Sequence, residues 1–304
     1  MGDITALNVH QSDLDTLQGQ LTDKGYRIHR TPHFMIGNRA PDPTDAQQTL
    51  LLHWFDPAAL DSNLGYYMKE ELKPLGLVSN PAQYADVFGA IVNSASPDDL
   101  WRVWHLFATN TLQRMDELMG TEQHTPIYPI ERFAALYTRV QNLCVGTSLL
   151  DAGCSQGFLS LMMAERLPRL TNITGVDIQE TPFALARAVA QERRLTQVNF
   201  VQADLLSDEL AASHRFDTVT LLHVLEHVSE PEIFAVLANL LKLTEHRLII
   251  AVPYDQGEPE QVYGHQQLFT REKLMEIGRW CIRQWGEGSM QYEDCADGLI
   301  WLDR

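Results

Sequence analysis

Basic residues are scarce in this chain of 304 residues: 23 lysines and arginines stand against 40 aspartates and glutamates, for a formal net charge of −17. A surface this acidic repels phosphate backbones and anionic lipids, and proteins that bind nucleic acid usually carry a basic patch. Basic residues cluster only in short pairs such as Arg193-Arg194. We therefore expect no nucleic-acid partner and no attraction to an acidic membrane surface.

Long apolar runs and cysteines are also lacking. No run approaches the length of about 20 residues that a membrane span needs, and residues 1–4 lack the basic-then-apolar pattern of a secretion signal. The four cysteines form no C-x-x-C pair, which argues against a disulfide framework and against a zinc site made of cysteines. Hydrophobic residues make up 45% of the chain, enough for a sizeable core. We expect a cytoplasmic globular protein without a membrane span.

The dinucleotide fingerprint G-x-G-x-x-G is absent. In its place an apolar run ends at Asp151, Gly153 and Gly157 follow, and a helical spacing begins at Phe158. Because glycine lacks Cβ, such a loop adopts unusual φ and ψ and lets a ligand approach its backbone. The helix behind it directs unpaired N–H groups and a partial positive charge at the loop, which favours an anionic group there. The pattern predicts a strand–loop–helix unit that binds a ligand.

Short apolar runs alternate with helical patterns after this loop, which predicts a parallel sheet with right-handed crossovers. The expected strands lie near residues 148–151, 173–177, 198–201, 216–222 and 247–253, with two final strands near 284–291 and 299–303. Ligands bind at the carboxyl ends of strands in such sheets. Asp177 ends the second strand and can accept both hydroxyls of a ribose, and Asp204 follows the third, where an adenine amino group would donate to it.

The first 125 residues contain no internal repeat and no motif for a ligand. Helices are predicted to begin at Asn80-Pro81 and at Ser96-Pro97, where a capping residue precedes proline. The run 49–55 fits a buried strand and a buried helical turn equally well. We expect a mainly helical N-terminal domain over 1–125, whose aromatic residues form an ordinary core or a lid over a substrate, and an α/β domain over 126–304.

The order of these features resembles the class I S-adenosylmethionine (SAM)-dependent methyltransferases. The segments that carry the resemblance are LLDAGCSQG, VDIQE, VQADLL and FDTVTLLHVLEHV, with Ser155 in place of the family's usual middle glycine. The resemblance implies a Rossmann-like seven-stranded sheet with the last strand antiparallel, and SAM as the cofactor. It also implies the residues that contact SAM: its methionine part (Gly153, Gly157), its ribose (Asp177), its adenine (Ile178, Asp204, Leu205) and the surroundings of its sulfonium (His223). Asp151 and Cys154 of the same loop are also expected among the cofactor-binding residues.

His223, Glu226 and His227 form the pattern H-x-x-E-H, which also matches an inverted zinc-protease motif. The pattern directly follows a parallel strand, and the SAM motifs precede it in order, which argues against a protease. The turn also resembles the ubiquinone-type O-methyltransferases, in which an acid, a Glu and a His hold a divalent cation, although His223 replaces the first acid here. Two alternatives stay open: Glu226 and His227 bind a metal, or Glu226 caps a turn that His227 orients.

His265 lies in the loop 254–269 after the fifth strand, which is expected to cover the strand ends and contact a methyl acceptor. Because a histidine can take a proton from a hydroxyl near neutral pH, His265 is the first candidate for a catalytic base and His227 the second. An ordinary loop histidine is the alternative. Residues 126–133 and 263–265 together resemble the mycofactocin oligosaccharide methyltransferases, which implies a sugar hydroxyl as the acceptor.

These observations predict a SAM-dependent methyltransferase that acts on a hydroxyl of a small molecule or a saccharide. N- or C-methylation of a small metabolite is one alternative, and a SAM-binding regulatory or scaffold protein without catalysis is another. A divalent cation is the less favoured alternative to a histidine base. The sequence contains no signal for the oligomeric state.

Overall fold

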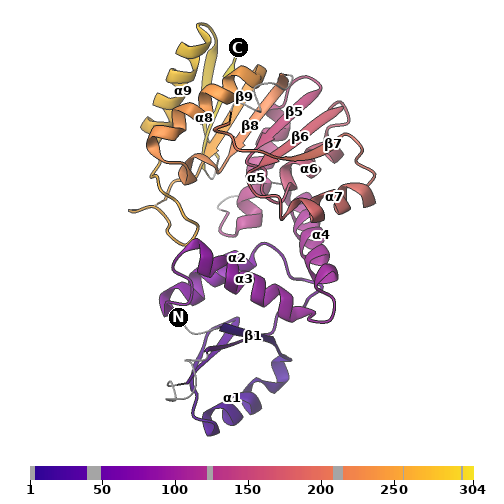
Figure 1. The fold of residues 1–304 in the computed structure, drawn as a ribbon, viewed down its shortest axis with the longest axis vertical. Coiled ribbons are helices and arrows are strands. Elements are labelled where there is room, and N and C mark those ends of the chain that lie inside the picture. The colour runs from indigo at the N-terminus through magenta and orange to yellow at the C-terminus, as the bar shows by residue number, and fades with distance from the viewer. Residues whose placement is uncertain (1–3, 40–48, 122–125, 208–214, 256, 296) are drawn as a thin grey trace. The chain divides into compact units, whose positions relative to one another are not determined.

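The computed structural model describes the chain except residues 1–3, 40–48, 122–125, 208–214, 256 and 296 (Figure 1). The chain forms two compact units. Unit 1 comprises residues 1–113 and 261–263, and unit 2 comprises residues 114–260 and 264–304. The boundary expected between residues 125 and 126 touches 122–125, which lie outside the described residues.

A seven-stranded sheet with the order β10-β11-β9-β8-β5-β6-β7 forms the centre of unit 2 (Figure 1). Its strands are β5 (Ser148–Ala152), β6 (Asn172–Asp177), β7 (Val198–Gln202), β8 (Phe216–Leu222), β9 (Thr244–Val252), β10 (Ser289–Cys295) and β11 (Asp297–Asp303). Strands β5 to β9 pair in parallel, and β11 is antiparallel to both of its neighbours. The predicted Rossmann-like sheet with an antiparallel last strand is confirmed.

The strand order reverses at β5, which pairs with β6 on one side and with β8 on the other. The chain runs outward from β5 to β7 and then returns to β8, so the connections leave their strands in opposite directions at this point. In open parallel sheets, ligands bind in the crevice that such a reversal creates at the carboxyl ends of the strands. The loops after β5, β6 and β8 are therefore the first place to look for a site.

The helices of unit 2 begin at the capping signals in the sequence. They are α5 (Pro129–Leu143), α6 (Phe158–Arg166), α7 (Phe183–Glu192), α8 (Glu230–Leu243) and α9 (Arg271–Trp285), with a single 3-10 turn at Leu225–His227. Ser229 and Glu232 form a capping box at the start of α8, and the Thr270 hydroxyl accepts from the Lys273 N–H at the start of α9. Leu237 and Leu240 of α8 and Leu274 of α9 are buried in one apolar cluster with the sheet.

One boundary in unit 2 differs from the prediction. The helix expected to end near Cys281 continues to Trp285, so the strand expected from residue 284 begins only at Ser289. Ile277, Cys281 and Trp285 are spaced by four residues, the first two are buried, and the Trp285 indole donates to the Leu241 carbonyl. Gly286, with φ of +83°, then ends the helix in a conformation that favours glycine.

Unit 1 contains a four-stranded sheet with the order β1-β4-β3-β2 (Figure 1). Its strands are β1 (Ile4–Asn8), β2 (Arg27–Arg30), β3 (Phe34–Asn38) and β4 (Thr49–His53), of which only the last coincides with a run that the sequence singled out. Its helices are α1 (Leu14–Asp23), α2 (Leu64–Tyr67), α3 (Pro81–Ala95) and α4 (Leu100–Leu118), with shorter turns at Gln11–Asp13, Met68–Leu72 and Lys73–Leu75. Helices hold most of the regular structure of this region, as expected, and the sheet is additional.

Among the described residues, no helix is both long enough and apolar enough to cross a membrane.

Candidate functional site

The loop between β5 and α6 leaves no room for side chains at its two glycines. Gly153 and Gly157 both have φ of +75°. A Cβ at Gly153 would overlap the Val224 side chain, and a Cβ at Gly157 would overlap the Phe200 ring. The N–H groups of Gly153 and Cys154 both donate to the Val176 carbonyl, at 2.7 and 2.9 Å, which ties the loop to β6. The loop is thus a tightly held turn of bare backbone at the carboxyl end of the sheet.

Asp151 lies beneath this loop and is 3% exposed. Its carboxylate accepts hydrogen bonds from the Ser160 hydroxyl of α6 at 2.8 Å and from the Thr220 hydroxyl of β8 at 3.2 Å. Burial raises the pKa of Asp151 to about 6, against the opposing effect of these two hydroxyls. Cys154 is also buried, and burial raises the pKa of its thiol, which keeps it uncharged. These two side chains hold the loop from inside.

Asp177 is at the carboxyl end of β6, and its two oxygens accept from backbone N–H groups on either side. One accepts from Ser155 at 2.8 Å and the other from Gln179 at 3.0 Å. The next residue, Ile178, is 62% exposed, which is unusual for a large apolar side chain. A carboxylate and an exposed apolar surface therefore lie side by side next to the glycine loop.

Asp204 follows β7, whose last residue pairs with Asp177. Its carboxylate accepts from the Leu206 N–H at 2.8 Å, and Leu205 between them is 9% exposed. The Ala203 N–H donates to the Asp177 carbonyl at 3.0 Å, so the end of β7 is fastened to the end of β6. The predicted residues after β5, β6 and β7 therefore lie along one edge of the sheet.

His223, directly after β8, has φ of +53°, in the left-handed region that few residues other than glycine adopt. Its Nε2 lies 3.1 Å from an Asp297 oxygen at the start of β11, and Arg132 of α5 binds the same carboxylate. Burial opposes a charge on His223, but the hydrogen bond with Asp297 and the charge of Asp297 outweigh it and raise the pKa of the ring. Asp297, at the start of β11, thus fixes the ring of His223 beside the end of β8.

Glu226 and His227 lie in the short 3-10 turn after β8, and the loop 264–267 binds this turn. The N–H groups of Gln266 and Gln267 donate to the Glu226 carbonyl at 2.6 and 3.2 Å, and the Gln266 amide donates to the His227 carbonyl at 2.7 Å. His265 is thereby placed beside His227, with their ring centroids 5.0 Å apart. The sequence-predicted pair of catalytic histidines is brought together.

Glu226, His227 and His265 each offer one ligating atom within 4.8 Å of the others. Glu226 is 1% exposed, and among the described residues neither of its carboxylate oxygens has a hydrogen-bond partner. Burial raises the pKa of Glu226, against the opposing charge of His223, and burial lowers the pKa of His227 with His265 acting in the same direction. The cluster contains His265 in place of His223, because His223 precedes the 3-10 turn with φ of +53° and its Nε2 faces Asp297.

Comparison with known proteins agrees with this arrangement. A family model described as a methyltransferase domain matches residues 149–246, which run from β5 into β9 and include the loops described above. Unit 2 contains a class I SAM-dependent methyltransferase domain. The matched residues cover the carboxyl ends of β5, β6, β7 and β8, so they include all of the predicted SAM-contacting positions.

Two curated relatives of the methyltransferase domain are ubiquinone biosynthesis O-methyltransferases. The one from Pseudomonas aeruginosa (strain UCBPP-PA14) is 38% identical over 87 residues, which is 28% of this chain and 35% of the relative. The one from Idiomarina loihiensis (strain ATCC BAA-735 / DSM 15497 / L2-TR) is 41% identical over 88 residues, 29% of this chain and 34% of the relative. The chain thus spans about a third of the length of these relatives. The narrower resemblance to mycofactocin methyltransferases stays a prediction.

The solved structure of small RNA methyltransferase HEN1 superimposes with a TM-score of 0.50 and 16% identity, over 60% of this chain and 26% of that one. This similarity shows the fold. It agrees with the strand order that places the methyltransferase domain's glycine loop at the point where the sheet reverses.

The residues of the methyltransferase domain fit SAM. The glycine loop has positive φ at Gly153 and Gly157, Asp177 can accept a diol, and Ile178 offers an apolar face to a base. The N-terminus of α6 directs N–H groups toward the loop, as an anionic carboxylate requires. Cofactor chemistry is therefore expected on the β5–β7 side and acceptor chemistry beside β8.

Three residues of this edge were not predicted from the sequence. Asp255 binds Nδ1 of His265 at 2.6 Å, and Asp297 and Arg132 hold His223. Arg132 and Asp297 are 165 residues apart, and nothing in the sequence pairs them. Asp255 is ten residues before His265 in the same loop. The sequence signal for this pair was therefore only that one loop contains both an Asp and a His.

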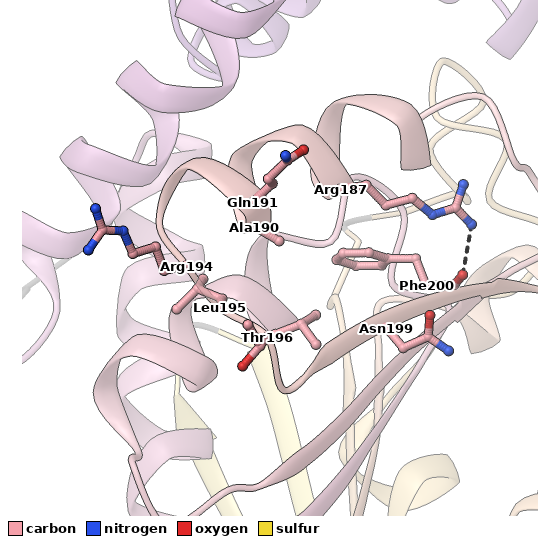
Figure 2. A pocket seen from close by; sticks show the side chains of 9 residues that line it. Arg187, Ala190, Gln191, Arg194, Leu195, Thr196, Asn199 and Phe200 are labelled. Carbon is pink, nitrogen blue, oxygen red and sulfur yellow. Dashed lines mark hydrogen bonds between the residues drawn. The ribbon is translucent and has the colours of Figure 1, made fainter.

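A separate hollow of about 410 Å³ lies between α7 and β7 and contains none of the predicted site residues (Figure 2). Arg187 and Arg194 are among its lining residues, but their guanidinium groups point in opposite directions (Figure 2). Arg187 is engaged by the Phe200 carbonyl at 2.9 Å. The two arginines therefore do not form a convergent anion site.

Proposed function

We propose that the protein transfers a methyl group from SAM to a hydroxyl of a small molecule. The observation that carries this proposal is the division of one sheet edge into two halves. The glycine loop, Asp177 and Ile178 occupy the half expected to hold SAM, and Glu226, His227 and His265 gather after the adjacent strand β8. The O-methyltransferase relatives support a hydroxyl as the acceptor.

SAM, when bound, supplies an electrophilic methyl group on its sulfonium. The acceptor oxygen forms a bond to the methyl carbon, the carbon–sulfur bond breaks, S-adenosylhomocysteine leaves, and the hydroxyl proton departs. The task of the protein is to align these atoms, exclude water and make the oxygen more nucleophilic. The loops at the sheet edge align the reactants and exclude water, and His265 and His227 make the acceptor oxygen more nucleophilic.

We place His265 and His227 at the acceptor hydroxyl. Asp255 only accepts hydrogen bonds, so Nδ1 of His265 donates to it and the lone pair of the ring lies on Nε2. Such an imidazole can take the proton as a base, or it can hold a cation that lowers the pKa of the hydroxyl. Both routes use the same residues.

The acceptor is proposed as a small molecule, and a saccharide hydroxyl is the narrower proposal from residues 126–133 and 263–265. The acidic charge of the chain supports an acceptor other than nucleic acid. The lid over a substrate that residues 1–125 were expected to form stays a prediction. Two alternatives are methyl transfer to nitrogen or carbon, and a scaffold protein that binds SAM without methyl transfer. The experiment below distinguishes them from the proposed function.

The test begins with calorimetry of the full chain. We expect one SAM site per chain with a Kd of roughly 1–100 µM, and no competition by NAD, since the dinucleotide fingerprint is absent. Methyl-labelled SAM is then incubated with the protein and a metabolite extract, and the labelled product is identified by mass spectrometry and NMR. A methoxy product supports the proposal. Binding of NAD without SAM, or binding of SAM without transfer to any metabolite, would contradict it.

A further inference from the structure

The loop 255–265, which ends at His265, has the sequence DQGEPEQVYGH and little material for a core of its own. It contains three acids and two glycines, and its only large apolar side chains are those of Val262 and Tyr263. A polar segment with several like charges is ordered only where hydrogen bonds or buried apolar groups hold it. The position of His265 therefore depends on a small number of contacts made by this loop.

Hydrogen bonds close the base of the loop within unit 2. One Asp255 oxygen accepts from the Glu260 N–H at 3.1 Å and from Nδ1 of His265 at 2.6 Å. The His265 N–H donates to the Glu260 carbonyl at 3.2 Å, so these two residues lie side by side. The residues between them form a tight turn, and Gly264, with φ of +77°, supplies its left-handed conformation directly before His265.

The tip of the loop, residues 261–263, belongs to unit 1. Val262 is completely buried, and the Tyr263 ring packs edge-on against the Tyr84 ring of α3, with the centroids 5.3 Å apart. The Lys69 amine lies 5.8 Å from the centre of the Tyr263 ring, within the range of a cation–π contact. The two large apolar side chains of the loop are thus the ones that anchor its tip.

We propose that Tyr263 is a positioning residue for His265. Only Gly264 separates the two, so the place at which the Tyr263 ring is held sets where the chain enters His265. The hydrogen bond to Asp255 then sets the rotation of the imidazole. This role rests on the proposed function, in which His265 acts at the acceptor hydroxyl. A displacement of about 1 Å lowers a rate by up to about 100-fold even when its cause is remote from the chemistry.

The hydrogen bond between His265 and Asp255 gives a readout that requires no methyl acceptor. Charge-assisted hydrogen bonds of this kind are short and strong, so the shared proton resonates far downfield in NMR and exchanges slowly with water. Nδ1 of His33 lies 2.5 Å from a Glu71 oxygen and gives an internal reference in the same spectrum. Both signals are recorded in SAM-free, full-length protein with isotope-labelled histidine, and His265→Gln and His33→Gln assign them.

Tyr263→Ala removes the anchor, so it should abolish or strongly weaken the His265 signal and leave the His33 signal in place. The rate at which labelled SAM methylates the metabolite extract should fall by about 10–100-fold, with the Kd for SAM unchanged within about twofold. Tyr263→Phe retains the ring that packs against Tyr84. It should therefore restore both the His265 signal and the rate to near the wild-type level.

Trp54→Ala is the matched control for the loss of a ring in unit 1. The Arg30 guanidinium lies 5.8 Å from the centre of the Trp54 ring, which matches the cation beside Tyr263. Trp54 packs against the apolar cluster of α1, β3 and β4 instead of the loop tip. We expect this variant to retain the His265 signal and the wild-type rate, and thermal unfolding shows whether each variant is folded.

The outcomes separate this proposal from the proposed function. An unchanged His265 signal or an unchanged rate in a folded Tyr263→Ala variant would overturn the positioning role and leave methyl transfer standing. The same holds if Trp54→Ala loses as much as Tyr263→Ala does, or if wild-type protein shows no slowly exchanging His265 proton. If wild-type protein transfers no methyl group but Tyr263→Ala still loses the His265 signal, Tyr263 positions His265 and the proposed function is wrong.

Discussion

Among single residues, Asp151 makes the free energy of unfolding depend on pH. Burial raises its pKa to about 6, whereas an Asp carboxyl ionises near 3.8 when unperturbed. Between these values the unfolded chain loses the proton and the folded chain keeps it, so the unfolded state is favoured increasingly as pH rises from about 4 to 6. At about 1.4 kcal/mol per pKa unit, this residue lowers the free energy of unfolding by roughly 3 kcal/mol above pH 6.

The variant Asp151→Asn cannot ionise, so it should escape this loss. Relative to wild type, its free energy of unfolding should therefore increase by about 2–3 kcal/mol as the pH rises from 4 to 7. Urea denaturation of SAM-free protein at the two pH values measures the difference, and the titrations of other residues cancel in it. If the free energies of unfolding of Asp151→Asn and wild type differ by the same amount at both pH values, Asp151 ionises normally in the folded state.

Asp177 is the residue on which SAM affinity should depend most. Asp177→Ala is expected to weaken SAM binding by about 1.5–3 kcal/mol, the scale for hydrogen bonds to a charged group. Because Ser155 and Gln179 also lose their acceptor, a modest loss of stability should accompany it. Calorimetry and thermal unfolding separate the two effects. Glu180→Ala, at an exposed acid three residues on, is the control and should retain wild-type affinity. If Asp177→Ala binds SAM as tightly as wild type does, Asp177 stabilises the loop and does not contact SAM.

At the scale of elements, the β5–α6 loop depends on the absence of a side chain at Gly153. Gly153→Ala adds left-handed strain of about 1–2 kcal/mol and also a collision with Val224. Gly286→Ala, at a similar φ of +83° but with nothing within 4 Å of the added Cβ, carries the strain alone. We expect both variants to lose stability, and only Gly153→Ala to lose SAM affinity, by about tenfold or more. Equal affinities would show that the loop does not contact SAM.

The elements of unit 2 were predictable because their signals are local. Apolar runs ending in Asp177, a capping box at Ser229 and a proline at the start of α5 each act within a few residues of themselves. The sheet of unit 1 was not predicted. Its strands are four or five residues long, and β2, with the sequence RIHR, exposes three of its four residues. Such strands are stabilised by pairing with distant partners, which sequence periodicity does not record.

The residues of the site divide in the same way, into those marked by local motifs and those brought together only by folding. The residues predicted to contact SAM lie in motifs, because a ligand of fixed shape demands certain residues at fixed spacing. Partners of the histidines were missed: Arg132 and Asp297 meet His223 only after the whole sheet has assembled. The H-x-x-E-H spacing pointed to the right turn, but His223 binds Asp297, and the third member of the cluster came from a loop 39 residues beyond Glu226.

For the whole molecule, the net charge of −17 favours an acceptor other than nucleic acid. The fold is shared with a small RNA methyltransferase, at a TM-score of 0.50, but the chain has a net charge of −17. Proteins that bind RNA replace counterions on phosphates with lysines and arginines. Within the described residues, Arg187 and Arg194 both line the hollow between α7 and β7, and their guanidinium groups point in opposite directions (Figure 2). Fold similarity and acceptor class are therefore independent here.

We expect no binding of single- or double-stranded RNA by fluorescence anisotropy at about 0.15 M salt. The salt dependence is the sharper measurement. Lower salt strengthens the attraction of a basic protein to phosphates, whereas it strengthens repulsion from a protein of charge −17, so binding should stay absent as salt falls. Binding that tightens at low salt would reveal a local basic patch. Arg194→Glu, tested beside Arg102→Glu in α4 as a charge-matched control, would show whether the α7–β7 hollow is that patch.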